Sequence, residues 1–169
     1  MERKLTLSDH IFKTYTLIYL LRPEHILLLQ RDKGKSDMAN KLTGLGGKIE
    51  PGENLIESAT RECFEESGIT MHNPQFRGTF QWFDDSNKIC MTHIFFATDF
   101  SGELQTENRE GLLTWYLISE LENLSNLAAY QKMFLTYLLA DEHNFYSGIC
   151  RFENEEIVDY VDSTGRKHA

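Results

Sequence analysis

The stretch RECFEE at residues 61–66 carries three carboxylates, Glu62, Glu65 and Glu66, at a spacing that suits cation chemistry. If a helix begins near Asn54, a rotation of about 100° per residue places the three on one arc beside an apolar stripe. Taken alone, such a string also suits a solvated helix face. An acidic arc beside a core stripe, however, needs a compensating cation, because carboxylates four residues apart repel by about 0.2–0.5 kcal/mol or more. Hard ions such as Mg²⁺ or Mn²⁺ prefer these oxygen ligands.

A glycine-rich segment leads into this helix. The glycines that precede Lys48 are Gly44, Gly46 and Gly47. Glycine lets the backbone approach a ligand closely or turn with a positive φ. Pro51 and Gly52 then predict a tight turn before the helix. A glycine turn next to an acidic helix favours a ligand site over a solvated face.

The spacing within this region matches a known pattern. Counted from Gly47, the sequence reads glycine, five residues, Glu53, seven residues and RECFEESGI. The chain therefore resembles the Nudix hydrolases, whose signature is G-x5-E-x7-R-E-U-x-E-E-x-G-U with U an aliphatic residue. Cys63 stands at an aliphatic position, where a buried cysteine behaves as a small hydrophobe. Flanking segments, from TYTLIYLL to SGICRFENEEIVDY, resemble the MutT-type hydrolases of oxidised purine nucleoside triphosphates over nearly the full length.

The resemblance implies a fold and a set of metal ligands. The fold is α/β, an α/β/α sandwich around a mixed β-sheet. The length and composition of the chain suit a single domain spanning residues 1–169. The glutamate and arginine that match Glu53 and Arg61 form an ion pair that holds the helix against the loop. The family's metal ligands correspond to Gly46, through its carbonyl, and to Glu62, Glu65 and Glu66. The implied cofactor is Mg²⁺ or Mn²⁺.

Further positions match residues that contact the substrate in the family. Lys48 corresponds to a phosphate-contacting lysine, and Arg31 ends its strand where related enzymes place another phosphate-binding cation. A surface charge is the alternative for Arg31. Glu110 lies in the loop where relatives carry a further acidic ligand or base, although a solvated loop carboxylate fits it equally. Glu65, Glu66 or Glu110 would accept the proton of the attacking water.

The implied activity is hydrolysis of a nucleoside triphosphate, such as 8-oxo-dGTP, to the monophosphate and pyrophosphate, which sanitises the nucleotide pool and serves DNA repair. Trp82 would offer a stacking wall for the base, or is plain core. Some relatives read the base with a Trp-Pro-Asp-Asp segment that opens the late helix. Here the region is SNLAA at 125–129, so Asn126 or Asn123 is the candidate replacement.

Two other readings remain open. The substrate could instead be ADP-ribose, a dinucleoside polyphosphate or coenzyme A. Relatives acting on the first two usually carry a proline or a tyrosine about sixteen residues past the motif, where this chain has DDS at 84–86. A non-catalytic nucleotide-sensing module is the other reading, but such domains usually lose a motif glutamate, and none is lost here.

Composition sets limits on partners and location. The 169 residues carry a net charge of -9, which repels nucleic-acid polymers and anionic membranes and favours a small nucleotide as partner. The N-terminus lacks an apolar signal region, and no apolar run reaches membrane-spanning length. The three cysteines, Cys63, Cys90 and Cys150, lack paired spacing. We therefore expect a reduced, cytoplasmic protein, either a monomer or a homodimer.

Hydrophobic periodicity predicts the elements that position these residues. Three hairpins are expected, and their predicted strands are Thr14–Leu21 with His25–Gln30, Phe76–Phe83 with Ile89–Thr98, and Phe145–Phe152 with Ile157–Val161. A further strand is expected at Leu113–Leu117 and a second helix at Asn126–Ala140. His25, His72 and His143 are expected in loops, and His93 at a packed or edge position on a strand.

Overall fold

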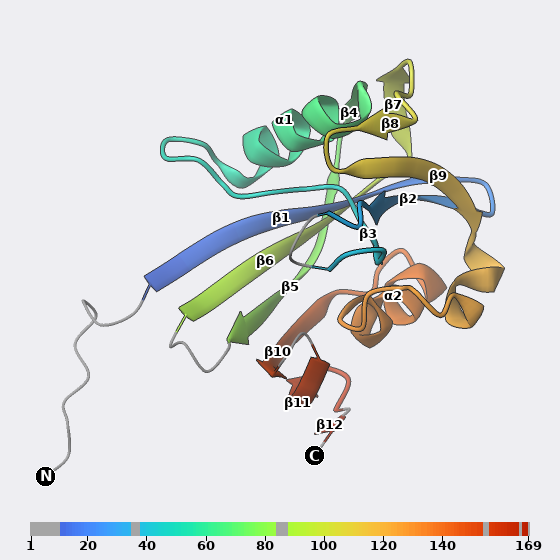
Figure 1. Ribbon diagram of the computed structural model, residues 1–169. Coiled ribbons are helices and arrows are strands. Elements are labelled where there is room, and N and C mark those ends of the chain that lie inside the picture. Colours follow the sequence, from blue (N-terminus) through green and yellow to red (C-terminus); the bar gives the residue numbers. More distant parts are fainter. Residues whose placement is uncertain (1–10, 35–37, 84–87, 154–155, 166, 169) are drawn as a thin grey trace, which may run out of the picture.

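The computed structural model describes residues 11–34, 38–83, 88–153, 156–165 and 167–168 (Figure 1). Two α-helices are present among them, α1 (Leu55–Ser67) and α2 (Gln131–Ala140), with a 3₁₀ segment at Ile118–Asn123. The strands are β1 (Ile11–Arg22), β2 (His25–Arg31), β3 (Leu42–Thr43), β4 (Ile69–His72), β5 (Gln75–Phe83), β6 (Lys88–Ala97), β7 (Asp99–Gly102), β8 (Glu107–Asn108), β9 (Gly111–Leu117), β10 (Tyr146–Glu153), β11 (Glu156–Asp162) and β12 (Lys167–His168).

The main sheet is mixed, as expected. Its strand order is β12-β11-β10-β5-β6-β1-β2-β9-β8, with β3 paired to β2. The pairs β1–β6 and β5–β10 are parallel, whereas the other pairs are antiparallel. Strands β4 and β7 form a separate two-stranded ribbon next to α1.

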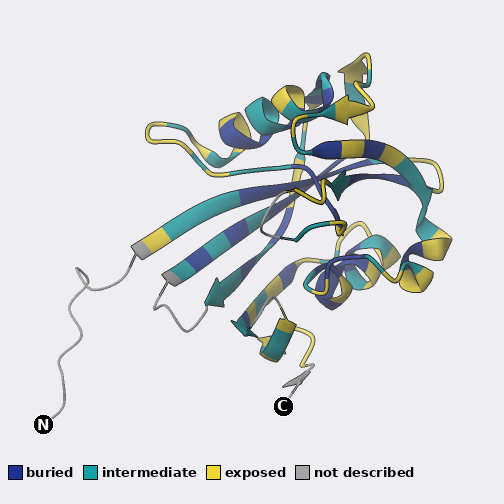
Figure 2. Ribbon diagram, in the orientation of Figure 1, coloured by how far each residue is buried: buried dark blue, intermediate teal, exposed yellow. Residues whose placement is uncertain are grey.

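One helix covers each face of this sheet (Figure 1). Alternate residues of β1 point to opposite faces, as strand geometry requires. Leu17 and Tyr19 join the core under α2, while Ile18 and Leu20 join the core under α1. Figure 2 shows buried residues along the strands where the helices lie over them. The expected α/β/α sandwich is therefore confirmed.

Strands β1 and β2 diverge, and the glycine-rich segment fills the space between them. The two strands pair only near their shared turn, at Leu21–Ile26 and Arg22–His25. Farther along β1, Ile18 exchanges backbone hydrogen bonds of 2.8 and 3.0 Å with Leu45, and Thr16 N donates to Gly47 O at 2.9 Å. The segment thus lies against β1 on one side and beneath α1 on the other.

Gly46 is the residue that makes this pairing possible. Its φ is +133°, which side chains rarely tolerate, and a Cβ there would lie 2.2 Å from the carbonyl oxygen of Thr16. Any other residue would push the segment away from β1.

The hairpins β1–β2, β5–β6 and β10–β11 agree with the expected strands, although the 84–87 turn lies outside the described residues. The late helix is shorter than expected, because Ala128 N donates to Leu42 O and Leu42 N donates to Asn126 O. Residues 126–128 therefore pair with β3, and α2 begins only after the turn at residues 129–130.

Two of the three histidines expected in loops lie on strands. His25 begins β2, where it pairs with Leu117, and His72 ends β4, where it pairs with Asp99. The loop expectation was wrong for both: the strand expected at His25–Gln30 does begin at His25, and His72 belongs to β4, a strand that the sequence did not indicate. His143 lies in the turn after α2, as expected, and His93 is half-buried on β6.

No helix among the described residues has the combined length and apolarity that a membrane-spanning segment requires.

Candidate active site

Helix α1 begins and ends at defined caps. Asn54 is its N-cap, and Oδ1 of Asn54 accepts from the N–H of Ile56 at 2.9 Å and of Glu57 at 3.0 Å. The Glu57 carboxylate accepts from Asn54 N at 2.9 Å, which completes a capping box. Gly68 closes the helix in the left-handed region with φ 73°. These caps fix the rotation of α1 and so the direction of its glutamates.

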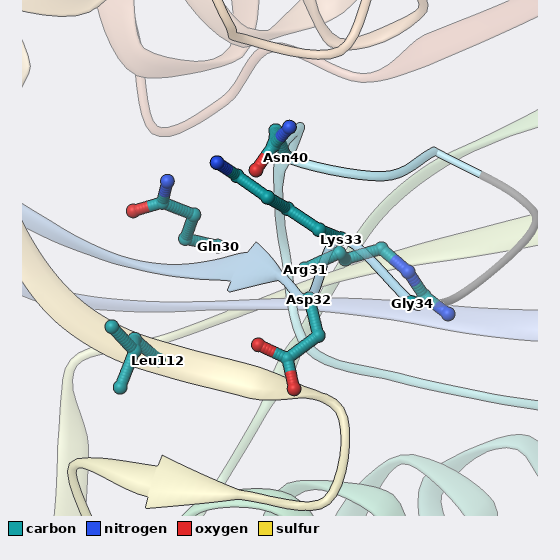
Figure 3. A pocket seen from close by; sticks show the side chains of 7 residues that line it. All are labelled: Gln30, Arg31, Asp32, Lys33, Gly34, Asn40 and Leu112. Atoms are coloured by element: carbon teal, nitrogen blue, oxygen red, sulfur yellow. The ribbon is translucent and has the colours of Figure 1, made fainter.

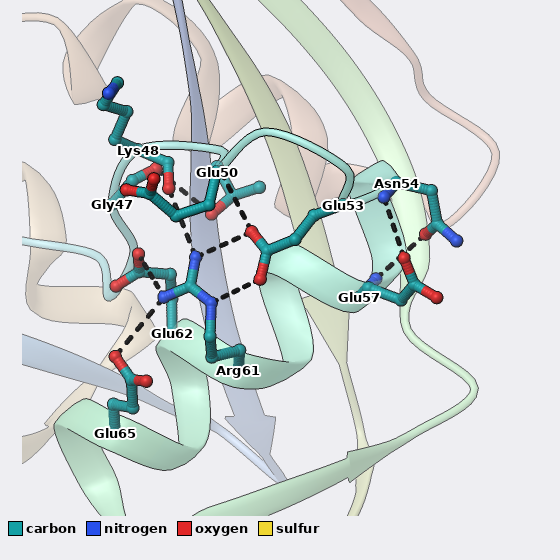
Figure 4. A network of polar contacts seen from close by, with 10 residues as sticks. Gly47, Lys48, Glu50, Glu53, Asn54, Glu57, Arg61, Glu62 and Glu65 are labelled. Atoms are coloured by element: carbon teal, nitrogen blue, oxygen red, sulfur yellow. Dashed lines mark hydrogen bonds and ion pairs between the residues drawn. The ribbon is translucent and has the colours of Figure 1, made fainter.

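Arg61 holds three carboxylates and one carbonyl (Figure 4). It forms a bidentate pair with Glu53, with Nε to Oε1 at 2.5 Å and NH2 to Oε2 at 2.9 Å. Its NH1 also donates to Glu62 at 2.8 Å and to Glu65 at 3.3 Å, while NH2 donates to the carbonyl of Lys48 at 3.3 Å. Hydrogen bonding to Arg61, and then to the backbone of Glu50, lowers the pKa of Glu53 to about 2. The expected Glu53–Arg61 pair is thus present and fastens α1 to the loop.

Glu66 lies between α1 and the glycine segment, with its carboxylate half-buried. Gly46 N donates to Glu66 Oε2 at 2.8 Å. The pKa of Glu66 is raised to about 7, chiefly by burial and also by the charges of Glu62 and Glu110, although the hydrogen bond from Gly46 N and the charge of Arg31 lower it. The carboxylates of α1 and of the loop at residue 110 therefore converge within electrostatic range.

Gly47 makes room for the carboxylate of Glu62. A Cβ at Gly47 would lie 2.5 Å from Oε1 of Glu62. Only a glycine lets the carboxylate approach the backbone this closely.

Glu110 approaches the same place from the turn between β8 and β9. Arg31 NH2 donates to Glu110 Oε2 at 3.2 Å, and Asp32 N donates to the carbonyl of Glu110 at 3.0 Å. Nε of Arg31 is buried and has no hydrogen-bond partner within the described part of the chain. Arg31 therefore keeps donor capacity beyond its bond to Glu110.

A surface pocket of about 560 Å³ adjoins this pair (Figure 3). It is lined by Gln30, Arg31, Asp32, Lys33, Gly34, Asn40 and Leu112. Of these, the sequence indicates only Arg31 as a site residue. The other lining residues form no sequence pattern that would predict a site, because the pocket forms where the end of β2, the loop after it and β9 meet in space.

The acidic group of the site consists of Glu62, Glu65, Glu66 and Glu110. Three residues expected to contact substrate lie apart from it. Figure 4 shows the Lys48 side chain extending away from the Arg61 network, so that only its carbonyl takes part. Trp82 lies on the α2 face of the sheet, where it stacks on Tyr15 with ring centroids 6.1 Å apart. Asn126 precedes α2, and its Nδ2 donates to the carbonyl of Asn40 at 3.2 Å.

The acidic group fits a hard divalent cation by its chemistry. Within the described residues no three potential ligand side chains are already gathered at coordinating distance. Arg61 accounts for part of this, because it draws Glu62 and Glu65 toward its guanidinium. The donors are nevertheless all oxygen. The pKa of Glu66 is raised first by burial and then by the charges of Glu62 and Glu110, and a bound cation would offset both effects.

Comparison with known proteins agrees with this geometry. The family model for the NUDIX domain matches residues 12–138. The chain is 37% identical over 83 residues to the uncharacterized Nudix hydrolase YvcI of Bacillus subtilis, which covers 47% of this chain and 52% of YvcI. It thus spans about half the length of that relative.

Two further matches extend over more of the molecule. The oxidized purine nucleoside triphosphate hydrolase of Danio rerio is 27% identical over 147 residues, covering 86% of this chain and 90% of the relative. The crystal structure of a MutT protein from Bacillus halodurans superposes with a TM-score of 0.81 at 28% identity, covering 91% of this chain and 99% of that one. The chain therefore belongs to the Nudix family and is a hydrolase that acts on phosphoanhydride bonds.

Proposed function

We propose that this protein hydrolyses purine nucleoside triphosphates, with preference for an oxidised purine such as 8-oxo-dGTP, to the monophosphate and pyrophosphate. One observation carries the proposal: Glu62 and Glu66, at positions that match the Nudix motif, lie against the glycine segment, and the charge of Glu110 acts on Glu66 from the turn before β9. The similarity to an oxidized purine nucleoside triphosphate hydrolase over 86% of the chain supports the choice of substrate.

Nudix hydrolases generally use divalent metal ions. Glu62, Glu65 and Glu66, with the carbonyl of Gly46, would hold Mg²⁺ or Mn²⁺. When bound, the ion supplies positive charge that neutralises phosphate oxygens. The bidentate pair with Glu53 holds the Arg61 guanidinium on the loop side of α1, and this keeps the ligand-bearing helix face aligned with Gly46.

The protein's own groups cover proton transfer and phosphate charge. Cleavage of a phosphoanhydride bond needs a water molecule that attacks in line with the leaving phosphate oxygen. It also needs a base that takes a proton from that water. Glu65, Glu66 and Glu110 are the candidate bases, and the raised pKa of Glu66 matches a base that works near neutral pH. Arg31, which lines the pocket, would contact phosphate through its guanidinium, and Lys48 would reach substrate phosphate from the loop after Gly47.

Base recognition would involve residues near the pocket and on the α2 face of the sheet. Trp82 offers an aromatic face next to Tyr15, and its indole Nε1 donates to Thr92 at 3.2 Å, which fixes the ring plane. Asn126 offers both a donor and an acceptor, which suits the altered edge of an 8-oxo base. Asn126 is bonded to Asn40, and Asn40 lines the pocket beside Arg31.

A panel of nucleotides tests this proposal. Release of pyrophosphate and phosphate is measured with Mg²⁺ for 8-oxo-dGTP, dGTP, ADP-ribose and a dinucleoside polyphosphate. We expect kcat/KM to be highest for 8-oxo-dGTP, with pyrophosphate as product. Faster cleavage of ADP-ribose or the dinucleoside polyphosphate would replace the proposed substrate with another Nudix substrate, and binding without any cleavage would favour a nucleotide-sensing module.

A further inference from the structure

The short strand β8 carries Asn108, whose side chain joins α1 to the turn that bears Glu110. Nδ2 of Asn108 donates to the carbonyl oxygen of Glu66 at 2.5 Å. Its Oδ1 accepts from the backbone N–H of Glu110 at 2.6 Å and of Gly111 at 3.1 Å. One amide side chain therefore bonds to three backbone groups on two elements.

The position of Glu66 in α1 explains the first bond. Glu66 lies in the last turn of the helix, where backbone carbonyls have no partner within the helix. The neighbouring carbonyl of Ser67 is taken up in the same way, by the N–H of Gln105 at 2.9 Å. The loop before β9 thus covers the C-terminal end of α1.

The other two bonds order the turn. The sequence Asn108-Arg109-Glu110-Gly111 has asparagine first and glycine fourth, which is typical of a type I turn closed by the asparagine side chain. Gly111 is required there, because a Cβ would lie 1.9 Å from the carbonyl oxygen of Gln30. Asn108 and β2 together leave the backbone of Glu110 little freedom.

Three hydrogen bonds help to fix Glu110 in place. Asn108 holds its N–H, Asp32 N holds its carbonyl at 3.0 Å, and Arg31 holds its carboxylate at 3.2 Å. Only Asn108 among these also bonds to α1, at the same residue whose carboxylate meets Gly46. Asn108 therefore links the backbone of Glu110 directly to the backbone of Glu66.

We propose that Asn108 is a positioning residue, which sets the place of the Glu110 carboxylate relative to Glu66 and acts on hydrolysis through Glu110. The inference rests on the proposed hydrolytic function. Both the Nδ2 and the Oδ1 of Asn108 are bonded to backbone groups. Asn108 therefore positions the turn and does not contact the reacting atoms.

A double-mutant cycle tests this role. The kcat and KM of Asn108→Ala, Glu110→Gln and the double variant are compared with those of the wild type on the best substrate of the nucleotide panel. We expect Asn108→Ala to lower kcat at least ~10-fold with KM within ~2-fold, and to lower kcat less than ~2-fold further when Glu110 is already glutamine. Equal losses in both backgrounds would show that Asn108 acts on the fold in general, and would overturn the proposal.

A second measurement reports on the geometry without turnover. Amide hydrogen exchange at Glu110 and Gly111 should be at least ~10-fold faster in Asn108→Ala than in the wild type. Glu107→Ala is the matched control, because Glu107 is exposed on the same strand, and it should leave both kcat and these exchange rates unchanged. Unchanged exchange rates in Asn108→Ala would show that Asn108 does not order the turn, and would overturn its positioning role. If the wild type cleaves no phosphoanhydride, the proposed function is wrong. The exchange rates do not depend on turnover, so they test the positioning role of Asn108 separately.

Discussion

At the scale of residues, the candidate site brings several carboxylates together, and their charges are offset in different ways. Arg61 offsets Glu53, Glu62 and Glu65, all within 3.3 Å of its guanidinium, while Glu66 depends on a backbone N–H and on burial. The opposite pKa directions of Glu53 and Glu66 follow from this difference. Two carboxyl groups on one motif thus have separate physical roles, since one fastens the helix and the other is held ready for a proton or a cation.

The raised pKa of Glu66 predicts a pH dependence of stability in chelator-treated protein. The folded state binds this proton more tightly than the unfolded chain, so the stabilising contribution is present below pH 4.5 and is lost as pH rises through about 7. The loss amounts to up to about 3 kcal/mol at 1.36 kcal/mol per pKa unit. Denaturant unfolding at pH 5 and pH 8 should show it in the wild type and not in Glu66→Gln. The same pH dependence in both proteins would contradict the assignment.

Gly47 gives a test of the space for Glu62. Gly47→Ala places a methyl group 2.5 Å from the Glu62 carboxylate and should weaken Mn²⁺ binding at least ~10-fold, measured by calorimetry. Gly34→Ala is the control, because a Cβ there meets nothing within 4 Å. Unaltered Mn²⁺ affinity in Gly47→Ala would show that the approach of Glu62 to the loop is unimportant.

At the scale of elements, α1 was predictable and the loops around it were not. The N-cap at Asn54 and the end near Gly68 follow from local capping rules that the sequence displays. Helix α2 begins five residues later than expected, because its first predicted turn bonds to β3, a partner far away in sequence. Strands β7 and β8 were not anticipated either, since their pairing depends on where α1 and β9 lie.

The cap of α1 provides the prediction at this scale. Asn54→Ala removes the acceptor for two helix N–H groups and should lower the free energy of unfolding by about 1 kcal/mol. Chemical denaturation measures the change. Asn123→Ala, at an exposed asparagine outside α1, should change stability by less than about 0.5 kcal/mol. Equal effects of the two substitutions would argue against the cap.

At the scale of the whole molecule, the site lies where β1 and β2 diverge and the glycine segment enters the sheet. The sequence indicated the motif glutamates by their spacing, and the resemblance to the Nudix motif implied the pairing of Glu53 with Arg61, which lies within the same segment. It did not indicate Asn108 or the pocket beside Arg31, because these assemble from β2, β8 and β9. The motif is local, and its supporting residues are not.

Binding of a cation to the folded state alone should stabilise the molecule. At a concentration 100 times its Kd, a divalent ion adds about 2.7 kcal/mol to the free energy of unfolding. The melting temperature of chelator-treated protein should therefore rise when millimolar Mn²⁺ or Mg²⁺ is added. Glu65→Gln should reduce this rise, and an equal rise in both proteins would place the ion elsewhere.

The most direct test of the central claim is the rate of pyrophosphate release from 8-oxo-dGTP and dGTP with Mg²⁺, for the wild type and for folded Glu65→Gln. We expect the wild type to favour 8-oxo-dGTP in kcat/KM, and Glu65→Gln to lose at least ~10²-fold in turnover through the loss of a ligand or base. Full activity in folded Glu65→Gln, or no pyrophosphate from either nucleotide, would contradict the account.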